Sequence, residues 1–318
     1  MGWVTLLPFE EQKEGTIRFG FSLTCGRNKE DFYTKSQEEL DKWLDALESI
    51  CILRDMVDDF AIIRQIGQGG QSQVFLAQNL NSGELVAVKH FDKQRFLNHP
   101  RRIQSLANEI ETLRTLEHSR VLKLYRVYES RQAVDLVTEF IPGETLFDSL
   151  SSQGFFSPSE FDRFIQNFLE LLAYLSSQNV LHRDLKPENI MVPDPSARGD
   201  FKLIDFGFAT KWTGQAIQES CGSLGYMAPE IVCSHPYGQT VDVYSAGMIF
   251  YVVAVGYSPF YATSKKEVLR LNAKNHISFD RSWETVDCKV SRLIKGMTST
   301  WPSQRKGAKE LRTEFMES

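Results

Sequence analysis

The sequence has no excess of positive charge. Its 318 residues include 36 Lys and Arg against 41 Asp and Glu, which gives a formal net charge of −5 and a pI near 5.8. A protein that binds nucleic acid through the phosphate backbone needs a basic surface that releases counterions. We therefore expect no general nucleic-acid partner, and any basic patch has to be local.

Cysteine is scarce and irregularly placed. No two of the five cysteines form a C-x-x-C pair, and no histidine cluster accompanies them. An odd number of scattered cysteines does not make a disulfide framework or a zinc site of the usual spacing. The pattern indicates a reducing compartment and no structural zinc. The five positions are Cys25, Cys51, Cys221, Cys233 and Cys288.

Signals for targeting or membrane insertion are also missing. The first residues lack a charged-then-apolar signal sequence, and Leu6 stands where a myristoylation motif needs Ser or Thr. The uncharged run from Val243 to Ser264 is long enough to span a bilayer. Because Gly256 and Pro259 interrupt it, we interpret it as a buried helix and expect a cytoplasmic protein.

Residues 1 to 57 differ in composition from the rest. The segments TIRFGFSLTC and EDFYTK alternate as strands do, and a GRNK turn separates them. Ser36 and Glu39 then form a capping box, and an amphipathic helix follows with its apolar residues on one face. Those residues are Leu40, Trp43, Leu44, Leu47 and Ile50.

This β-β-α order with an inward Trp43 resembles the C-terminal half of a pleckstrin-homology domain. The alternative is a generic β-β-α cap that packs on the main domain. The resemblance implies phosphoinositide contact and membrane recruitment only if a complete domain exists upstream, because the early strands and basic loop that bind inositol phosphates would lie before Met1.

From Asp59 onward the chain is first strand-rich and then helical. Three strands are predicted between Phe60 and Phe91, and the first two are joined by the glycine-rich stretch IGQGGQSQVFLA. A helix over residues 98–116 and two more strands follow. Helical periodicity dominates after Ser157, where Pro158 suits a first helical position.

A series of motifs stands in fixed order along this part. Lys89 in VAVKH, Glu109 in the predicted helix, HRDLKPEN at 182–189, DFG at 205–207 and MAPE at 227–230 resemble the eukaryotic protein kinases. The resemblance covers residues 60–316. It implies an α+β bilobal fold, with a five-stranded antiparallel sheet and one helix in an N-lobe (60–141) and a mainly helical C-lobe (142–316).

The resemblance also implies the substrates and the catalytic residues. Phosphoryl transfer from Mg²⁺-ATP needs cations near the phosphates and acids that hold the metal. Asp184 would be the catalytic base, Lys186 would neutralise the γ-phosphate, and Asn189 and Asp205 would bind Mg²⁺. The nucleotide would contact Ile66, Gly67, Gln68, Gly69, Gly70, Val74, Ala87, Lys89, Glu109, Glu139, Ile141 and Met191. Thr138 would be the gatekeeper of a back pocket.

Two further features concern substrate and regulation. Lys186 in HRDLKPEN and Ser223 in CGSLGY are typical of Ser/Thr kinases, and the overall pattern is closest to the calcium/calmodulin-dependent group and its AGC-like neighbours. Many kinases have a phosphorylatable Thr two residues before CG, whereas this chain has Glu219. We hypothesise that Glu219 reaches Arg183 without modification, and Ser220 or Thr213 as the phosphosite is the alternative.

Other expectations follow from the same resemblance. Lys89 would form an ion pair with Glu109, and Ser223 would contact Asp184 and Lys186. Glu230 would pair with Arg305, and Asp242 would brace the catalytic-loop backbone. The partners would be protein substrates with Ser or Thr acceptors, and no basic calmodulin-binding tail follows the last predicted helix. The competing function is a pseudokinase or scaffold that binds nucleotide or partners without turnover, but Lys89, Asp184 and Asp205 are all present.

Overall fold

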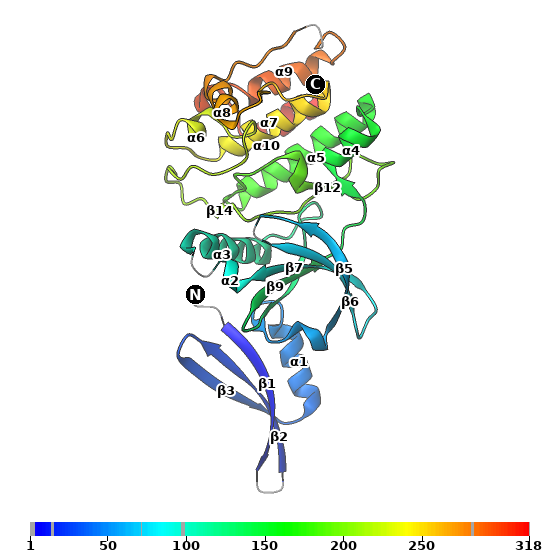
Figure 1. Ribbon diagram of the computed structural model, residues 1–318, viewed down its shortest axis with the longest axis vertical. Helices are drawn as coiled ribbons and strands as arrows, with labels where there is room; N and C mark the ends of the chain where they lie inside the picture. The colour runs from blue at the N-terminus through cyan, green and yellow to red at the C-terminus, as the bar shows by residue number, and fades with distance from the viewer. Residues whose placement is uncertain (1–3, 14–15, 71, 97–98, 281–282, 318) are drawn as a thin grey trace. The chain divides into compact units, whose positions relative to one another are not determined.

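The computed structural model describes residues 4–13, 16–70, 72–96, 99–280 and 283–317 (Figure 1). It contains two compact units. Unit 1 comprises residues 1–115 and 123–140, and unit 2 comprises residues 116–122 and 141–318. The glycine-rich loop position Gln71 lies outside the described residues, as do positions 97 and 98 of the region around the predicted helix start.

Unit 1 is built on one sheet of nine strands in the order β3-β2-β1-β4-β8-β9-β7-β6-β5. The strands β5, β6, β7, β9 and β8 are antiparallel neighbours and form the predicted five-stranded sheet. The elements of unit 1 are β1 (Val4–Lys13), β2 (Thr16–Cys25), β3 (Asn28–Thr34), α1 (Gln37–Leu47), β4 (Ile52–Leu53), η1 (Met56–Asp58), β5 (Phe60–Gln68), β6 (Gln73–Asn79), β7 (Leu85–Asp92), α2 (Lys93–Phe96), α3 (Pro100–Thr115), β8 (Leu124–Glu129) and β9 (Ala133–Glu139).

The N-terminal segment has three strands before its helix, so the predicted β-β-α order is wrong by one strand. The missed strand β1 pairs with β2 along its whole length and contains Pro8. Proline is rare inside a sheet because it lacks an N–H. It is tolerated here because the described pairing of β1 with β4 is confined to Thr5, which leaves Pro8 at an open edge.

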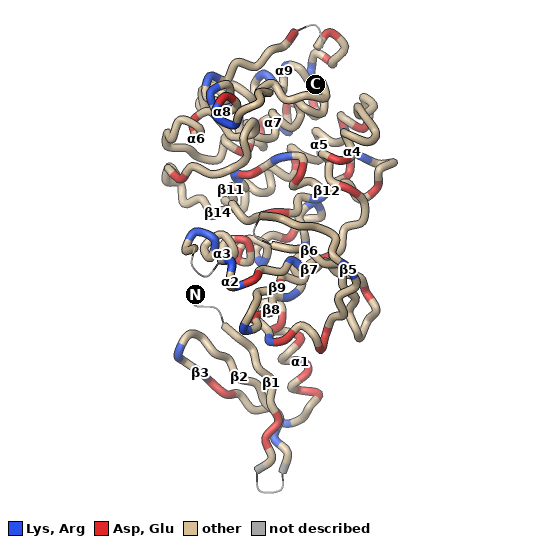
Figure 2. Tube along the Cα trace, in the orientation of Figure 1, with Lys and Arg blue, Asp and Glu red and all other residues tan. Residues whose placement is uncertain are grey.

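The same segment has its own small core. Leu6, Phe21, Leu40 and Cys51 are buried together between the sheet and α1. The halves of β1 and β2 nearest this core are uncharged, and their charged residues lie toward the other end of the pair (Figure 2). Trp43 was predicted to point inward, but it is 49% exposed, and its ring is tilted by 40° to that of Phe21 with the ring centroids 6.1 Å apart.

Helix α1 ends earlier than its apolar periodicity predicted. Ser36 caps the helix by accepting from the N–H of Glu39, as expected, but the helix stops at Leu47. Ile50, predicted on its apolar face, is 60% exposed, and Ile52 is fully buried in strand β4. The physical reason is the burial of Ile52. Its apolar side chain is removed from water in strand β4, and a helix that continued to this residue would keep it out of the sheet.

Unit 2 is mainly helical, with short strands in two small sheets. Its longest helix α5 begins at the predicted position, where Ser157 and Glu160 form a capping box. The elements of unit 2 are β10 (Glu144–Thr145), α4 (Leu146–Gln153), α5 (Pro158–Ser177), β11 (Val180–Leu181), η2 (Pro187–Asn189), β12 (Ile190–Val192), β13 (Lys202–Leu203), β14 (Thr210–Lys211), α6 (Pro229–Val232), α7 (Thr240–Val255), α8 (Lys265–Lys274), α9 (Cys288–Met297), η4 (Pro302–Gln304) and α10 (Ala308–Glu317).

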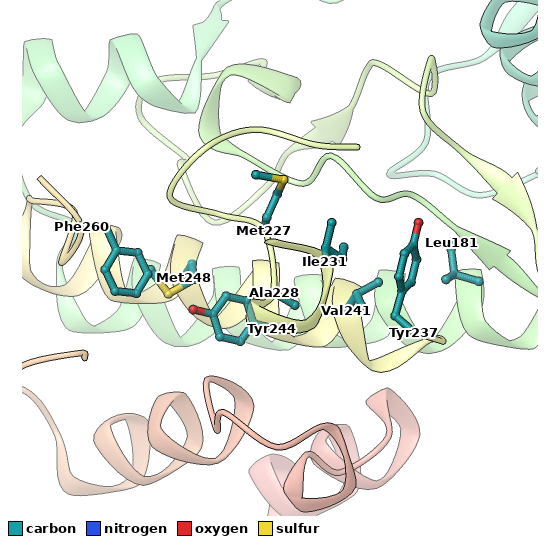
Figure 3. Close-up of a cluster of buried hydrophobic side chains, with 9 residues drawn as sticks. All are labelled: Leu181, Met227, Ala228, Ile231, Tyr237, Val241, Tyr244, Met248 and Phe260. Atoms are coloured by element: carbon teal, nitrogen blue, oxygen red, sulfur yellow. The ribbon is translucent and has the colours of Figure 1, made fainter. Parts of the chain in front are cut away.

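Helix α7 forms the centre of unit 2 and confirms that the uncharged run is a buried helix. It ends at Gly256, whose φ of +79° suits a C-cap. Figure 3 shows one cluster on it, in which Val241, Tyr244 and Met248 of α7 pack with residues from the neighbouring segments 181, 227–237 and 260. Within the described part of the chain, none of the helices is long and apolar enough to cross a membrane.

Candidate active site

The lysine and glutamate predicted to pair in unit 1 are in contact. Lys89 on β7 lies opposite Leu136 of β9, and its Nζ is 2.5 Å from Oε1 of Glu109 on α3. The side chain of Glu109 is 3% exposed and that of Lys89 is 19% exposed. An ammonium in an apolar strand needs such an anionic partner. The strand and the helix together therefore hold one cation at a fixed place in the sheet.

The glycine-rich loop joins β5 and β6, as predicted. Gly67 lies opposite Val74 in the strand pair, and the N–H of Gly69 donates to the carbonyl of Ser72 at 2.8 Å. A Cβ at Gly67 or Gly69 would meet only ordinary contacts at 3.5 Å, and one at Gly70 would meet nothing within 4 Å. Packing inside the protein does not require these glycines, which leaves room for a ligand to approach the backbone. Ile66 is 36% exposed on the same strand as Gln68.

Three predicted nucleotide-pocket positions lie side by side on β7 and β9. Ala87 pairs with Thr138, whose buried hydroxyl lies 3.3 Å from the carbonyl oxygens of Ala87 and Glu139. The N–H of Glu139 already donates to the carbonyl of Lys123. Met191 on β12 and the buried Ile141 belong to unit 2.

The catalytic-loop backbone in unit 2 is braced from α7. Both carboxylate oxygens of the buried Asp242 accept backbone N–H groups, from His182 at 2.6 Å and from Arg183 at 2.8 Å. This confirms the predicted brace. Burial raises the pKa of Asp242 and lowers the pKa of His182. The attraction between the two charged forms opposes both shifts but is the smaller effect. Arg183 has a φ of +66°, a conformation that such bonds help to hold.

Asp184, Lys186 and Asn189 form one hydrogen-bonded group. Nζ of Lys186 is 2.9 Å from Oδ2 of Asp184 and donates to the hydroxyl of Ser223 at 2.8 Å. Nδ2 of Asn189 donates to the backbone carbonyl of Asp184 at 2.8 Å and to its Oδ2 at 3.2 Å. Oδ1 of Asp184 is buried and has no hydrogen-bond partner among the described residues. An unpaired buried acceptor is unfavourable by about 1–3 kcal/mol.

Asp205 begins the DFG turn beside Asn189. The N–H of Ile204 donates to the carbonyl of Asn189 at 3.0 Å, and Oδ1 of Asp205 accepts from the N–H of Gly207. Among the described residues, no three His, Cys, Asp or Glu side chains gather as a metal site. Magnesium differs from metals that need such cages, because it uses one or two protein oxygens together with phosphate and water. The carboxylate of Asp205 and the amide oxygen of Asn189 fit that chemistry.

The segment after DFG meets the catalytic loop through Arg183. Nη1 of Arg183 donates to Oε2 of Glu219 at 2.8 Å, which is the contact hypothesised from the sequence. Tyr237 completes the group, since its hydroxyl donates to the backbone carbonyl of Glu219 at 2.6 Å and lies 3.2 Å from Nη1 of Arg183. Burial raises the pKa of Tyr237 to about 12. Sequence reasoning missed Tyr237, because nothing in the local sequence distinguishes it from a core tyrosine.

The predicted pair of Glu230 and Arg305 is also present. Two hydrogen bonds of 2.6 and 2.8 Å join the guanidinium to the two carboxylate oxygens. The side chain of Glu230 is 5% exposed and that of Arg305 is 0% exposed. The pair connects the MAPE motif on α6 to the segment after η4 within unit 2.

Comparison with known proteins agrees with this arrangement. Residues 60–316 match the family model described as the protein kinase domain. The calcium/calmodulin-dependent protein kinase type 1 of Caenorhabditis briggsae is 33% identical over 76% of this chain and 67% of the relative. The type 1 enzyme of Macrobrachium nipponense is 32% identical over 85% of this chain and 76% of the relative. A probable serine/threonine-protein kinase 2 of Plasmodium falciparum is 32% identical over 86% of this chain and 53% of the relative. The chain therefore belongs to the protein kinase family and is a protein serine/threonine kinase.

Proposed function

We propose that Asp184 is the catalytic base for phosphoryl transfer to Ser and Thr hydroxyls of protein substrates. The observation that carries this assignment is the buried, unpartnered Oδ1 of Asp184. Lys186 and Asn189 engage Oδ2 of the same carboxylate and orient it, while Oδ1 keeps its full capacity to accept a proton. A base within hydrogen-bond reach of the hydroxyl is the recurring requirement of this reaction.

The proposed reaction assigns one task to each group. The substrate hydroxyl passes its proton to Oδ1 of Asp184 while its oxygen forms a bond to the γ-phosphorus of ATP. The bond from that phosphorus to the bridging oxygen breaks, and ADP leaves. Lys186 stabilises the transferring group with its positive charge, and the hydroxyl of Ser223 fixes its ammonium.

ATP and Mg²⁺ are the reactants that protein kinases use in general. We propose that Lys89, held by Glu109, contacts the α and β phosphates, and that Asn189 and Asp205 supply the protein oxygens for Mg²⁺. When bound, Mg²⁺ would neutralise charge on the phosphates. The remaining nucleotide contacts are proposed at Ile66, Gly67, Gln68, Gly69, Gly70, Val74, Ala87, Glu139, Ile141 and Met191. The three loop glycines support this proposal, since packing does not require them.

Asp184→Asn in the full chain tests the assignment. With Mg²⁺, radiolabelled ATP and a degenerate Ser/Thr peptide library, kcat should fall by about 10²- to 10⁴-fold, because asparagine cannot accept the proton. The affinity for ATP should stay near the wild-type value. Asp194→Asn is a matched control in unit 2, because Asp194 is exposed and its side chain, as far as the described residues go, accepts hydrogen bonds from Ser196 alone. Wild-type turnover in Asp184→Asn would refute the role of the base.

The pseudokinase alternative is not favoured by these observations. Proteins that have lost catalysis commonly lack the equivalents of Lys89, Asp184 or Asp205, and all three are present here. Lys89 also keeps its ion pair with Glu109.

We further propose that the enzyme has basal activity without phosphorylation of the segment after DFG. Glu219 supports this, because its carboxylate occupies the position at which Arg183 would otherwise bind a phosphate. A carboxylate has about one charge and fewer acceptor oxygens than a phosphate, so it substitutes only partly.

Substrate preference follows from the carboxylates that remain accessible. Glu188 is exposed, whereas Oε1 of Glu144 already accepts from Gln153 and Ser152 on α4. We therefore propose at most a mild preference for basic residues near the acceptor, with Glu188 as the contact.

We propose that the kinase domain spans residues 60–316 and that residues 1–57 act as an extension of its N-lobe. The pairing of β1 with β4 and of β4 with β8 in one sheet supports this assignment over a separate lipid-binding module. Sedimentation with phosphoinositide vesicles should therefore leave a chain of residues 1–318 in the supernatant. Cosedimentation that depends on residues 1–57 would restore the lipid-binding interpretation.

A further inference from the structure

A two-residue strand before the kinase domain lies deep in unit 1. Ile52 and Leu53 form β4, which pairs in parallel with Val127 and Tyr128 of β8. On its other side β4 meets Thr5 of β1. Ile52 is fully buried. Strand β4 thus extends the five-stranded sheet at β8, and its Ile52 side chain is buried there although it lies outside residues 60–316.

The neighbours of Ile52 include the helix that carries Glu109. Ile52 shares one buried cluster with Leu106 and Ile110 of α3 and with Val127 and Leu136 of the sheet. Leu106 and Ile110 are four residues apart and face the same side of the helix, one on each side of Glu109 in the sequence. Ile52 therefore supports the turn of α3 from which Glu109 projects.

A second contact joins the same segment to the end of α3. Nη2 of Arg114 donates to the backbone carbonyl of Cys51 at 2.8 Å. Cys51 itself is buried in the N-terminal core with Leu6, Phe21 and Leu40. The helix is consequently attached at two successive turns to residues 51 and 52, by packing and by a hydrogen bond.

The adjoining face of α3 holds the pair proposed to contact the nucleotide. Glu109 is 2.5 Å from Nζ of Lys89, and Lys89 lies opposite Leu136, a member of the Ile52 cluster. A shift of α3 away from the sheet would lengthen the ion pair and release the ammonium. Side chains in close-packed cores transmit such shifts, because no free volume absorbs them.

We propose that Ile52 is a positioning residue for phosphoryl transfer, which holds α3 so that Glu109 keeps Lys89 in place. This inference rests on the proposed role of Lys89 with ATP. Residues 51–53 then contribute to catalysis from outside residues 60–316, and a kinase domain that lacks them has lower affinity for ATP.

Ile52→Ala in the full chain is the principal test. We expect a Kd for Mg²⁺-ATP that is about 2- to 30-fold higher, with the KM for the peptide substrate unchanged. Ile52→Val, which keeps most of the side chain, should restore the wild-type Kd. Leu40→Ala is the matched control, because Leu40 is equally buried but belongs to the N-terminal core. It should lower stability without changing the Kd for ATP.

A double-mutant cycle separates positioning from general destabilisation. In a Glu109→Gln background the ion pair is already broken, so Ile52→Ala should add little further loss of ATP affinity. Equal fold losses in both backgrounds, or an unchanged Kd in Ile52→Ala, would overturn the proposal. If Ile52→Ala does not fold, Arg114→Met removes the bond to Cys51 and should give the same selective effect on ATP.

Lys89→Met distinguishes failure of this inference from failure of the proposed function. Full turnover in Lys89→Met would refute the role of Lys89 itself. Loss of turnover in Lys89→Met together with wild-type kinetics in Ile52→Ala would refute only the positioning role.

Discussion

Arg183 of the catalytic loop donates a hydrogen bond to the carboxylate of Glu219 at 2.8 Å, in the segment that follows DFG. The guanidinium is 5% exposed, whereas the carboxylate is 60% exposed. The pair therefore fixes the loop through an acceptor that water can still reach. This geometry leads to the first prediction.

Glu219→Ala should lower kcat by about 3- to 30-fold, because Arg183 loses its anionic partner and the loop loses one attachment. Stability should change by less than about 1 kcal/mol, since a partly exposed ion pair contributes little. The measurement is peptide phosphorylation by protein that mass spectrometry shows to be unmodified. Wild-type activity in Glu219→Ala, or activity that appears only after phosphorylation of Ser220 or Thr213, would contradict the prediction.

Gly222→Ala should disturb the catalytic loop. Gly222 has a φ of +114°, and a Cβ there would lie 2.7 Å from the carbonyl oxygen of Arg183. We expect kcat to fall more than about 10-fold, since backbone rather than a flexible side chain has to move. Gly214→Ala is the matched control, with a φ of +86° and nothing within 4 Å. Equal activities of the two variants would show that the contact is unimportant.

Removal of one partner from the buried pair in unit 2 should destabilise the protein. Arg305→Met leaves Glu230 buried and unpaired, so the free energy of unfolding should fall by about 3–5 kcal/mol. Urea denaturation followed by circular dichroism measures this change. Lys42→Met, which breaks an exposed pair with Glu38, should change stability by less than about 0.5 kcal/mol. A similarly small effect of Arg305→Met would be inconsistent with the structure.

Acid should weaken unit 2 through Glu160. Hydrogen bonds from Arg198 and from the Ser157 cap lower the pKa of Glu160 from 4.5 to about 2. The folded protein then binds fewer protons than the unfolded chain between these values, so this contribution is complete above pH 4.5 and is lost as the pH falls toward 2. Glu160→Gln should flatten the pH dependence of stability in that range. An unchanged slope would show that the carboxylate has no such role.

Ser72→Gly in the glycine-rich loop should raise the KM for ATP by about 2- to 10-fold and leave kcat nearly unchanged. We expect its hydroxyl to donate to a phosphate, and a neutral hydrogen bond contributes about 0.5–1.5 kcal/mol. Steady-state kinetics at varied ATP concentration provide the measurement, and Ser72→Ala should behave like Ser72→Gly. A normal KM in both variants would mean that Ser72 only shapes the turn.

Several predictions from sequence were confirmed at the level of single contacts. The pairs Lys89–Glu109, Glu230–Arg305 and Lys186–Ser223 are present, as is the brace from Asp242. These contacts were predicted because the resemblance to the protein kinases, carried by motifs in fixed order, implies them. A charged residue within an apolar strand or helix also indicates an oppositely charged partner, because an unpaired buried charge is unfavourable. The buried helix around Tyr244 was predicted differently, from the uncharged run that Gly256 and Pro259 interrupt.

Other features could not be obtained in this way. The contact of Tyr237 with Arg183 joins positions 54 residues apart, and the local sequence around Tyr237 carries no sign of it. The Trp43 side chain was expected inside, but the small N-terminal core is filled by Leu6, Phe21 and Leu40. Whether a side chain on a small sheet is buried depends on which other residues cover it, and the periodicity of the sequence does not give those neighbours.

The sequence by itself determined the kinase fold, the order of the catalytic motifs and the starts of α1 and α5, because motif order, periodicity and capping residues can be read locally along the chain. Only the tertiary structure decided the end of α1 at Leu47 and the entry of Ile52 into the sheet. The helical pattern continued to Ile50, but α3 and β8 offered Ile52 complete burial. Packing against residues more than fifty positions away outweighed a weak local preference for helix.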